Sequence, residues 1–354
     1  MRVNTMIRAI SSLAVHHSSF IVHHSSPVAL VLLGLVVACG GRPLENEIER
    51  HPAQVLPQGA SQVFYGRVDR LRGDPLLAWA MEQGENVQWG QSLRGISEML
   101  RPAGEITRIA LGTYGAADKE PSAAVVAIGQ FDGEAFRQAL ESARTPFVES
   151  SYENHGLFTC GRGNARCYIC FPSPRVIVAA SQEDLLKRTV DLSKRSKKSL
   201  ARDQGFAPLL ESFSPEMDFW ATGLFPNAVA TLLSGQLQSP AIQLIQAFTI
   251  QLTGNESKRL ELVLHCASPE AAQANARILQ DLLGLLATQI YHAGYRIDEL
   301  LEALNRSEIV VEATRATFQI EMSRAEIAAT AEALRAGPAE QPMPEPLAPP
   351  VPLP

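Results

Sequence analysis

Four cysteines follow residue 100, and their spacing limits the thiol chemistry that is open to them. Cys160 and Cys167 flank Gly163-Asn164 within the segment Phe158–Ile169, a pattern typical of a hairpin whose turn needs positive φ. In such a hairpin the two cysteines lie opposite each other, with Cβ atoms about 4.5–5.5 Å apart. A disulfide needs roughly 3.5–4.5 Å between these atoms. We therefore expect a Cys160–Cys167 disulfide if the compartment is oxidising.

The same segment offers a second interpretation, a redox or zinc site at Cys167-Tyr-Ile-Cys170. A redox CxxC pair needs a helix N-terminus to lower the thiol pKa. The intervening tyrosine and isoleucine instead favour a strand, whose alternation puts the two thiols on opposite faces. The sequence holds no second CxxC and no histidine pair at metal spacing, so we expect neither a metal nor a cofactor. Cys266, beside His265, is interpreted as a buried strand residue or as a partner of Cys170.

The fifth cysteine, Cys39, ends the segment Val36-Val-Ala-Cys39 and follows an apolar run over residues 28–38. Arg2 and Arg8 supply the basic start of a secretory signal. The apolar run is well short of the roughly 20 residues that span a bilayer. The segment resembles the lipobox of bacterial lipoproteins. That resemblance implies cleavage before Cys39, a diacylglycerol on its thiol, and acylation of the new N-terminus by a chain such as palmitate, which together give a stable anchor.

Composition limits the partners of the mature chain. The whole chain carries a formal charge of −6. Cleavage of residues 1–38 would take away two arginines and no acidic residue, so the mature chain would carry −8. An acidic chain is a poor partner for phosphate backbones, so we expect no nucleic-acid partner. The lipobox implies a cell-envelope protein whose folded part lies in the periplasm or at the cell surface. Gly40 after the lipidated residue favours the outer membrane over the inner one.

The folded part of the chain shows one local pattern repeatedly. Alternating or apolar strands are followed by helix caps and amphipathic helices, with caps expected at Asp132, Ser181, Ser268 and Ser323. The spacing from Ser181 to Asp184, like that from Ser323 to Glu326, is typical of a capping box or a close variant. Asp132 corresponds to Ser268, and Ser181 corresponds to Ser323, so the chain is expected to contain an internal repeat.

These boundaries predict five parts: a signal peptide 1–38, a tether 39–57, modules 58–205 and 206–335, and a Pro-rich disordered tail 336–354. Strands joined by short turns favour antiparallel pairing. We therefore expect an α+β fold of two similar modules, each an antiparallel sheet with helices packed on one face. This arrangement resembles a group of uncharacterised secreted bacterial proteins with duplicated strand–helix modules, for which no common activity is known.

No catalytic motif is present: the sequence lacks GxSxG, HExxH, a P-loop and a dinucleotide fingerprint. We expect a non-catalytic, membrane-anchored envelope lipoprotein that binds another envelope protein or acts as a scaffold. The alternative is a carrier or sensor of an apolar ligand held between the modules, lined by the apolar segments Ala228–Leu237 and Ala276–Ile290. An enzyme with a site assembled from distant residues is the third hypothesis. If the repeat is real, the seam between the modules is the expected binding surface.

Overall fold

The computed structural model describes residues 47–75, 104–115, 122–161, 166–195, 198–225, 227–292, 295 and 297–337. The predicted signal peptide, the predicted lipidation site Cys39 and nearly all of the Pro-rich tail lie outside these ranges. Within the described part, no helix is both long enough and apolar enough to cross a membrane.

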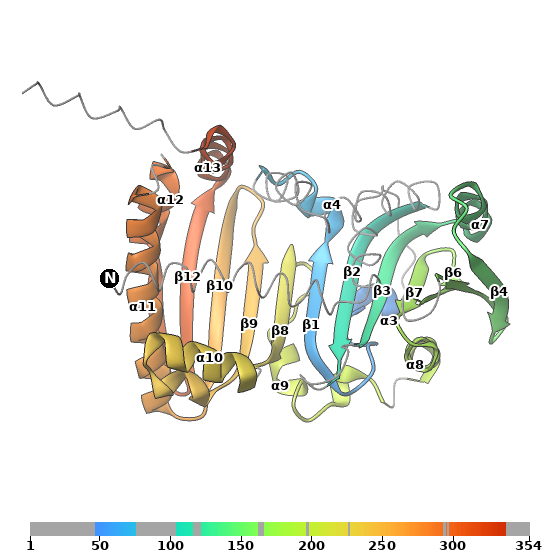
Figure 1. The fold of residues 1–354 in the computed structure, drawn as a ribbon, viewed down its shortest axis with the longest axis horizontal. Coiled ribbons are helices and arrows are strands. Elements are labelled where there is room, and N and C mark those ends of the chain that lie inside the picture. The colour runs from blue at the N-terminus through green and yellow to red at the C-terminus, as the bar shows by residue number, and fades with distance from the viewer. Residues whose placement is uncertain are drawn as a thin grey trace, which may run out of the picture.

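The described strands form a single twelve-stranded sheet in which every pair of neighbours is antiparallel (Figure 1). The order across the sheet is β11-β12-β10-β9-β8-β1-β2-β3-β7-β6-β5-β4. The strands are β1 (Ala60–Arg67), β2 (Gly104–Tyr114), β3 (Ser122–Phe131), β4 (Phe147–Tyr152), β5 (His155–Cys160), β6 (Cys167–Ser173), β7 (Val176–Ala180), β8 (Phe219–Leu224), β9 (Ile245–Thr253), β10 (Ser257–Cys266), β11 (Glu308–Glu312) and β12 (Arg315–Ser323). The fold is α+β with antiparallel pairing, as the sequence predicted.

The ladder between β1 and β8 joins the first part of the chain to the second. It runs from Gln62 opposite Gly223 to Gly66 opposite Phe219. Gly223 is needed there because a Cβ at this position would lie 2.8 Å from the Gln62 side chain and 3.0 Å from a backbone carbonyl oxygen. Outward from this ladder, β1, β2, β3 and β7 follow one another on one side, and β8, β9, β10 and β12 do so on the other. The exact module boundaries stay a prediction.

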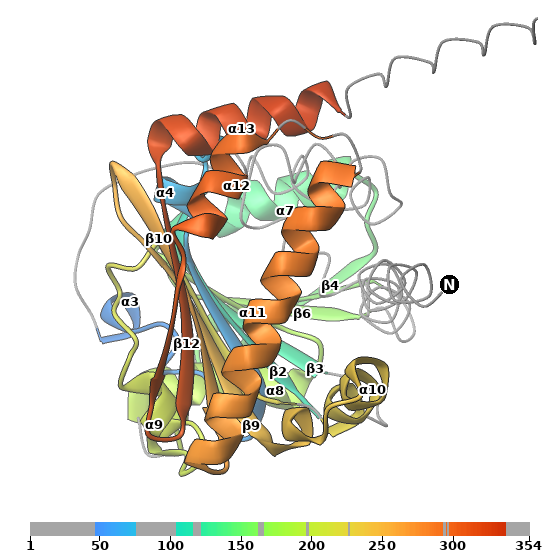
Figure 2. The same cartoon turned by 90° about the vertical axis from the view of Figure 1, so that its left-hand side faces the viewer.

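The helices pack against both faces of the sheet. They are α3 (Glu47–Arg50), α4 (Val68–Leu71), α7 (Gly133–Ser142), α8 (Glu183–Arg195), α9 (Ala207–Leu210), α10 (Asn227–Leu237), α11 (Pro269–His292), α12 (Asp298–Asn305) and α13 (Arg324–Ala336), with short 3₁₀ turns η4 (Leu200–Arg202) and η5 (Pro240–Leu244). Figure 2 shows α9 and α11 on opposite sides of the sheet.

The helix arrangement differs from the expectation of a single covered face in the first part of the chain. There α7 places Phe136 in the same core as Val125, while α8 places Leu186 in a second core with Val126 on the other face. The reason lies in β3 and β7, whose residues are buried in succession and not in alternation. A strand that is apolar on both faces must be covered on both.

In the second part of the chain α10 to α13 cover one face of the sheet, whereas the short helix α9 lies on the other face, so the expectation of a single covered face holds only for the longer helices. Strand β12 alternates, with Ala316, Phe318, Ile320 and Met322 buried. These four side chains lie in two cores that are closed by residues of α10, α11, α12 and α13. The apolar helices α10 and α11 were expected near the seam between the modules. Instead, α11 packs over β10, β11 and β12, at the edge of the sheet away from the β1–β8 ladder (Figure 1).

Three of the four predicted helix caps are formed. Asp132 accepts hydrogen bonds from two backbone N–H groups at the start of α7, at 2.9 and 3.2 Å. Ser268 accepts one from Ala271 at 3.2 Å, so α11 begins at Pro269. Ser323 and Glu326 form a reciprocal capping box at the start of α13. Local sequence determines these helix starts because each cap satisfies N–H groups within three residues.

The fourth predicted cap, Ser181, does something else. Its hydroxyl accepts a hydrogen bond from the backbone N–H of Ala123 at 2.9 Å, and its own N–H donates to the Ala123 carbonyl at 3.0 Å. Ser181 thus extends the contact between β7 and β3 beyond the last strand pair. Helix α8 begins two residues later, at Glu183. The capping prediction was wrong here because a nonlocal N–H takes the side-chain oxygen.

Candidate functional site

A cleft of about 430 Å³ lies between one face of the sheet and a wall formed by α9 and the residues directly after it. This is the face opposite α10 to α13. The residues lining it are Pro208, Leu209, Glu211, Ser212, Thr249, Gln251, Glu261, Val263, His265, Val310, Glu312, Arg315, Thr317 and Gln319. Most of these side chains are polar. They come from four strands, β9, β10, β11 and β12, and from the wall formed by residues 208–212.

A chain of hydrogen bonds connects His265 to the sheet interior. His265 Nε2 lies 3.1 Å from the Thr249 hydroxyl, which lies 3.0 Å from the hydroxyl of Thr222. Thr222 in turn donates to the Phe248 carbonyl at 2.7 Å. Burial of the imidazole, and secondly the charge of Arg315, lower the pKa of His265 below its ordinary value. The imidazole is therefore neutral at neutral pH and can both donate and accept hydrogen bonds in the cleft.

The carboxylates give the cleft a negative balance. Glu211, Glu261 and Glu312 line it, whereas Arg315 is the one cation among its described lining residues. Glu261 accepts a hydrogen bond from Gln319 at 3.3 Å and lies 3.8 Å from the guanidinium of Arg259, whereas no ion pair is recorded for Glu211 or Glu312 among the described residues. Such an arrangement favours a polar ligand that carries positive charge.

This cleft was not predicted from the sequence, although the sequence contains a signal for it. In β10, Glu261, Val263 and His265 alternate with leucines, so they lie on the face opposite the leucine core. Thr317 and Gln319 alternate in the same way with the buried residues of β12. A polar row on adjacent strands predicts a sheet face that no helix covers.

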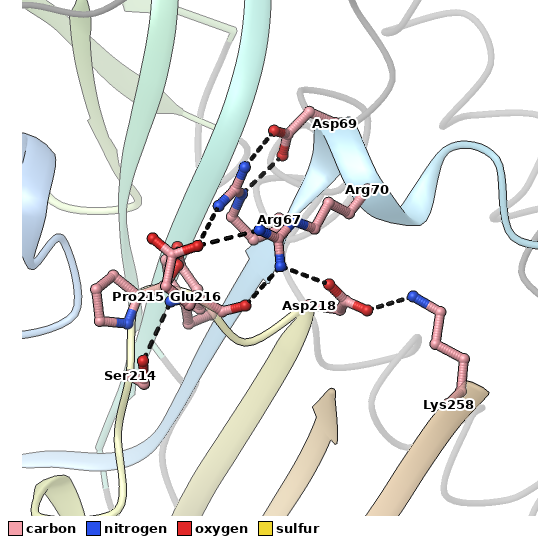
Figure 3. Close-up of polar contacts among 9 residues, drawn as sticks. Arg67, Asp69, Arg70, Ser214, Pro215, Glu216, Asp218 and Lys258 are labelled. Atoms are coloured by element: carbon pink, nitrogen blue, oxygen red, sulfur yellow. Dashed lines mark hydrogen bonds and ion pairs between the residues drawn. The ribbon is translucent and has the colours of Figure 1, made fainter. Parts of the chain in front are cut away.

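A second polar feature is a charged cluster at the end of the β1–β8 ladder (Figure 3). Arg67 makes a bidentate contact with Asp69, at 3.0 and 2.6 Å. Arg70 lies 3.0 Å from the Glu216 carboxylate and donates to the Glu216 carbonyl at 2.8 Å. Asp218 binds both Arg70, at 3.4 Å, and Lys258.

This cluster connects three parts of the sheet. Arg67 and Arg70 belong to the end of β1 and to α4, Asp218 directly precedes β8, and Lys258 lies on β10. The Asp218 side chain is completely buried, with an exposed fraction of 0%. A buried carboxylate is tolerated only when cations or hydrogen bonds compensate its lost hydration. The cluster therefore fixes how the start of β8 is placed against β1 and β10.

A smaller cleft of about 260 Å³ adjoins the cluster and is lined in part by Arg70, Lys258 and Arg324. Two of these three cations already pair with carboxylates of the cluster. The cluster is thus explained by its structural role, and we place the candidate binding site in the larger polar cleft.

The predicted disulfide partners lie opposite each other, as expected for a hairpin. Cys160 is directly opposite Cys167 in the β5–β6 ladder, and both are buried. The structure records all four described cysteines as free thiols, so the bridge itself stays a prediction. Burial raises the pKa of Cys160 to about 11 and raises the pKa of Cys167 further. Neither thiol has the low pKa of a reactive cysteine. The turn residues 163–164 lie outside the described part.

Cys167, Cys170 and Cys266 lie in three different cores. Cys167 and Cys170 lie in cores on opposite faces, as strand alternation predicted. Cys266 lies in a third core, beside α11, where it accepts a hydrogen bond from Asn275. Cys266 is thus a buried strand residue and not a neighbour of Cys170.

His155 closes the β4–β5 hairpin opposite Tyr152, across a two-residue turn with positive φ at Glu153 and Asn154. In the described ranges, no three His, Cys, Asp or Glu side chains are grouped so that they could hold a metal ion.

Comparisons with known proteins give few matches. No protein-family model matches the chain, and a search of curated proteins finds no match. Crystal form III of TP0453 is similar with a TM-score of 0.46 and 15% identity, over 80% of this chain and 97% of that one. Form I gives 0.44 and 14%, over 80% and 96%, and form IV gives 0.45 and 13%, over 78% and 94%. At these TM-scores the similarity carries no argument about function.

The buried carboxylate leads to a stability prediction. Asp218→Ala leaves Lys258 and Arg70 without their shared partner, and removing one member of a buried ion pair costs about 3–5 kcal/mol. We expect a loss near the lower value, because Arg70 keeps Glu216. Asp69→Ala, which removes a more exposed carboxylate, should cost less than about 1 kcal/mol. Urea unfolding measures both, and equal losses would contradict the structural role of Asp218.

The lowered pKa of His265 leads to a pH prediction. The unfolded chain binds the proton more readily, so the stability from neutral His265 is fully present above about pH 6.5. It is lost as the pH falls through the lower native pKa. We expect His265→Gln to lose less stability than the wild type between about pH 7.5 and about pH 5. His155→Gln, at the hairpin turn, controls for the removal of one histidine. An unchanged pH profile in His265→Gln would refute the prediction.

The opposed cysteines lead to a redox prediction. Non-reducing peptide mapping of the protein from an oxidising envelope should link the peptides that contain Cys160 and Cys167. The bridge closes a short loop, so reduction should destabilise the fold by about 2–3 kcal/mol at most. Free thiols at both positions in such a preparation would show that the bridge does not form.

Proposed function

We propose that this chain is a lipid-anchored envelope protein that binds a basic segment of another protein in the polar cleft. The membrane part of the proposal rests on the lipobox resemblance at Val36–Cys39. The binding part rests on the cleft between the sheet and residues 208–212. The role is non-catalytic, in keeping with the absence of catalytic motifs from the sequence.

The chemistry of the cleft supports a protein segment as the ligand. Gln251, Glu261 and Gln319 lie in one row across three adjacent strands, and Thr317 lies two residues along β12 from Gln319, so the floor of the cleft offers side-chain donors and acceptors to a polar segment. The three glutamates favour lysine or arginine side chains on the partner. A cleft of about 430 Å³ holds a few side chains, so the remaining contact area would lie on its rim.

The alternative of an apolar ligand has less support from this geometry. The two parts of the chain meet edge to edge through the β1–β8 ladder, with Tyr65 and Trp220 buried beside it. The polar cleft and the smaller cleft beside the charged cluster are both lined mainly by polar and charged residues. Burying apolar groups against unpaired polar groups costs free energy.

The cleft proposal predicts site-specific photo-crosslinking in intact cells that carry the full chain. A crosslinker at Thr317, inside the cleft, should give one protein adduct of defined mass. The double substitution Glu261→Gln and Glu312→Gln should reduce its yield several-fold, because it removes two charges that attract the partner. Cys39→Ala should release the protein from membranes and lower the yield further if the partner is also membrane-bound.

Matched controls separate the cleft from the rest of the surface. Glu302→Gln with Glu332→Gln removes two exposed charges from α12 and α13, outside the cleft, and should leave the adduct unchanged. A crosslinker at Glu332 should not give the same adduct. Equal yields from both crosslinker positions would refute the cleft as the binding site. Loss of the adduct on adding an apolar probe would instead favour the carrier alternative.

A further inference from the structure

Strand β4 forms one end of the sheet and has an unusually open edge. Its burial pattern shows that Val148, Glu149, Ser150 and Ser151 are exposed on both faces of the strand. Val148, with 66% of its surface exposed, is the most exposed of the large apolar residues in the described part. Figure 1 shows β4 at the far end of the sheet, and the strand order places it beyond β6 and β5. The strand contains no proline, no lysine and no bulge, and Glu149 is its one charged residue.

The opposite edge, β11, is protected in several ways. Glu308 and Glu312 stand at its two ends, and the strand is only five residues long. Helix α11 packs against it. Like charges and a covered face discourage pairing with another strand. Although β11 also exposes Val310 and Val311, the β4 edge, with no helix packed against it among the contacts of the described residues and a single charge, is the more open of the two.

The pairing of β4 with β5 determines which backbone groups face outward. Gly161 donates to the Pro146 carbonyl at 3.0 Å, which makes this a hydrogen-bonded position of the ladder. Hydrogen-bonded positions alternate along an antiparallel pair, so Val148, Ser150 and Tyr152 also bond inward. The backbone N–H and C=O groups of Phe147, Glu149 and Ser151 therefore point to the free edge.

We propose that two copies of this chain associate by antiparallel pairing of β4 with β4 of a second copy. In such a pair the outward-facing residues must bond to outward-facing residues, which limits the registers. Centring the pair on Glu149 would put two glutamates opposite each other, and like charges directly opposed are destabilising. Centring it on Ser150 avoids this.

The register centred on Ser150 also matches the side chains. It places Glu149 opposite Ser151 and Val148 opposite Tyr152, each twice because of the two-fold symmetry. An aromatic residue opposite a β-branched one is a favourable cross-strand pair. The Tyr152 ring is already held, since its hydroxyl donates to Asp191 at 3.0 Å and Lys187 Nζ lies 5.3 Å from its centre. The exposed Val148 thus gains an ordered apolar partner.

Disulfide trapping tests both the association and its register. In the proposed register, Ser150 of one copy lies opposite Ser150 of the other. This is a non-hydrogen-bonded position, where the two Cβ atoms are close enough for a disulfide. Ser150→Cys in the full-length protein should form a disulfide-linked dimer under mild oxidation. Glu149→Cys alone should not, because residue 149 faces Ser151. A mixture of Glu149→Cys and Ser151→Cys proteins should give the mixed dimer.

Two further measurements keep the test decisive. The wild-type protein controls for the five native cysteines, four of which are described and buried, and should give no dimer. Adding Val148→Lys to Ser150→Cys should lower the dimer yield several-fold while circular dichroism stays unchanged, because it charges the exposed apolar site without touching the core. Equal dimer yields from Ser150→Cys and Glu149→Cys, or none from either, would overturn the proposal. Capture of a different protein at position 150 would show that the edge serves another partner.

Discussion

The β1–β8 ladder is the interaction on which the rest of this structure depends, because it makes one sheet from strands that come from two parts of the chain. Tyr65 and Trp220 face each other in it and are buried with Phe213 packed edge-on against both. The charged cluster around Asp218 closes the end of the ladder. Burial of these aromatic side chains supplies the larger stabilisation, whereas the ion pairs fix the geometry and are costly to break.

The pattern of burial along each strand then decides what covers the sheet. Strands β3 and β7 are apolar on both sides, so α7 and α8 pack on opposite faces. Strands β10 and β12 alternate, so α11 to α13 cover only one face. The face that α10 to α13 leave uncovered carries the polar cleft. The candidate binding site is therefore a consequence of where the apolar coverage of the sheet ends.

Some of the site could have been predicted, and some could not. The alternation of Glu261, Val263 and His265 in β10 places them on one face, which is a local property of a strand. Their meeting with Glu211 across the cleft depends on how the segment after α9 folds back over the sheet. The lowered pKa of His265 likewise depends on burial and on Arg315, a residue fifty positions away that lies opposite it on β12.

By itself the sequence determined the α+β class, the antiparallel pairing, the caps at Asp132, Ser268 and Ser323, and the opposition of Cys160 and Cys167. These features depend on hydrogen bonds and alternation within a few residues. Only the tertiary structure decided that the strands form a single sheet, that helices lie on both faces, that Ser181 bonds to a distant strand, and that β4 is left open at one edge. Each of these outcomes is a competition among distant segments for the same surface or the same N–H group, and its result depends on packing, which local sequence does not contain.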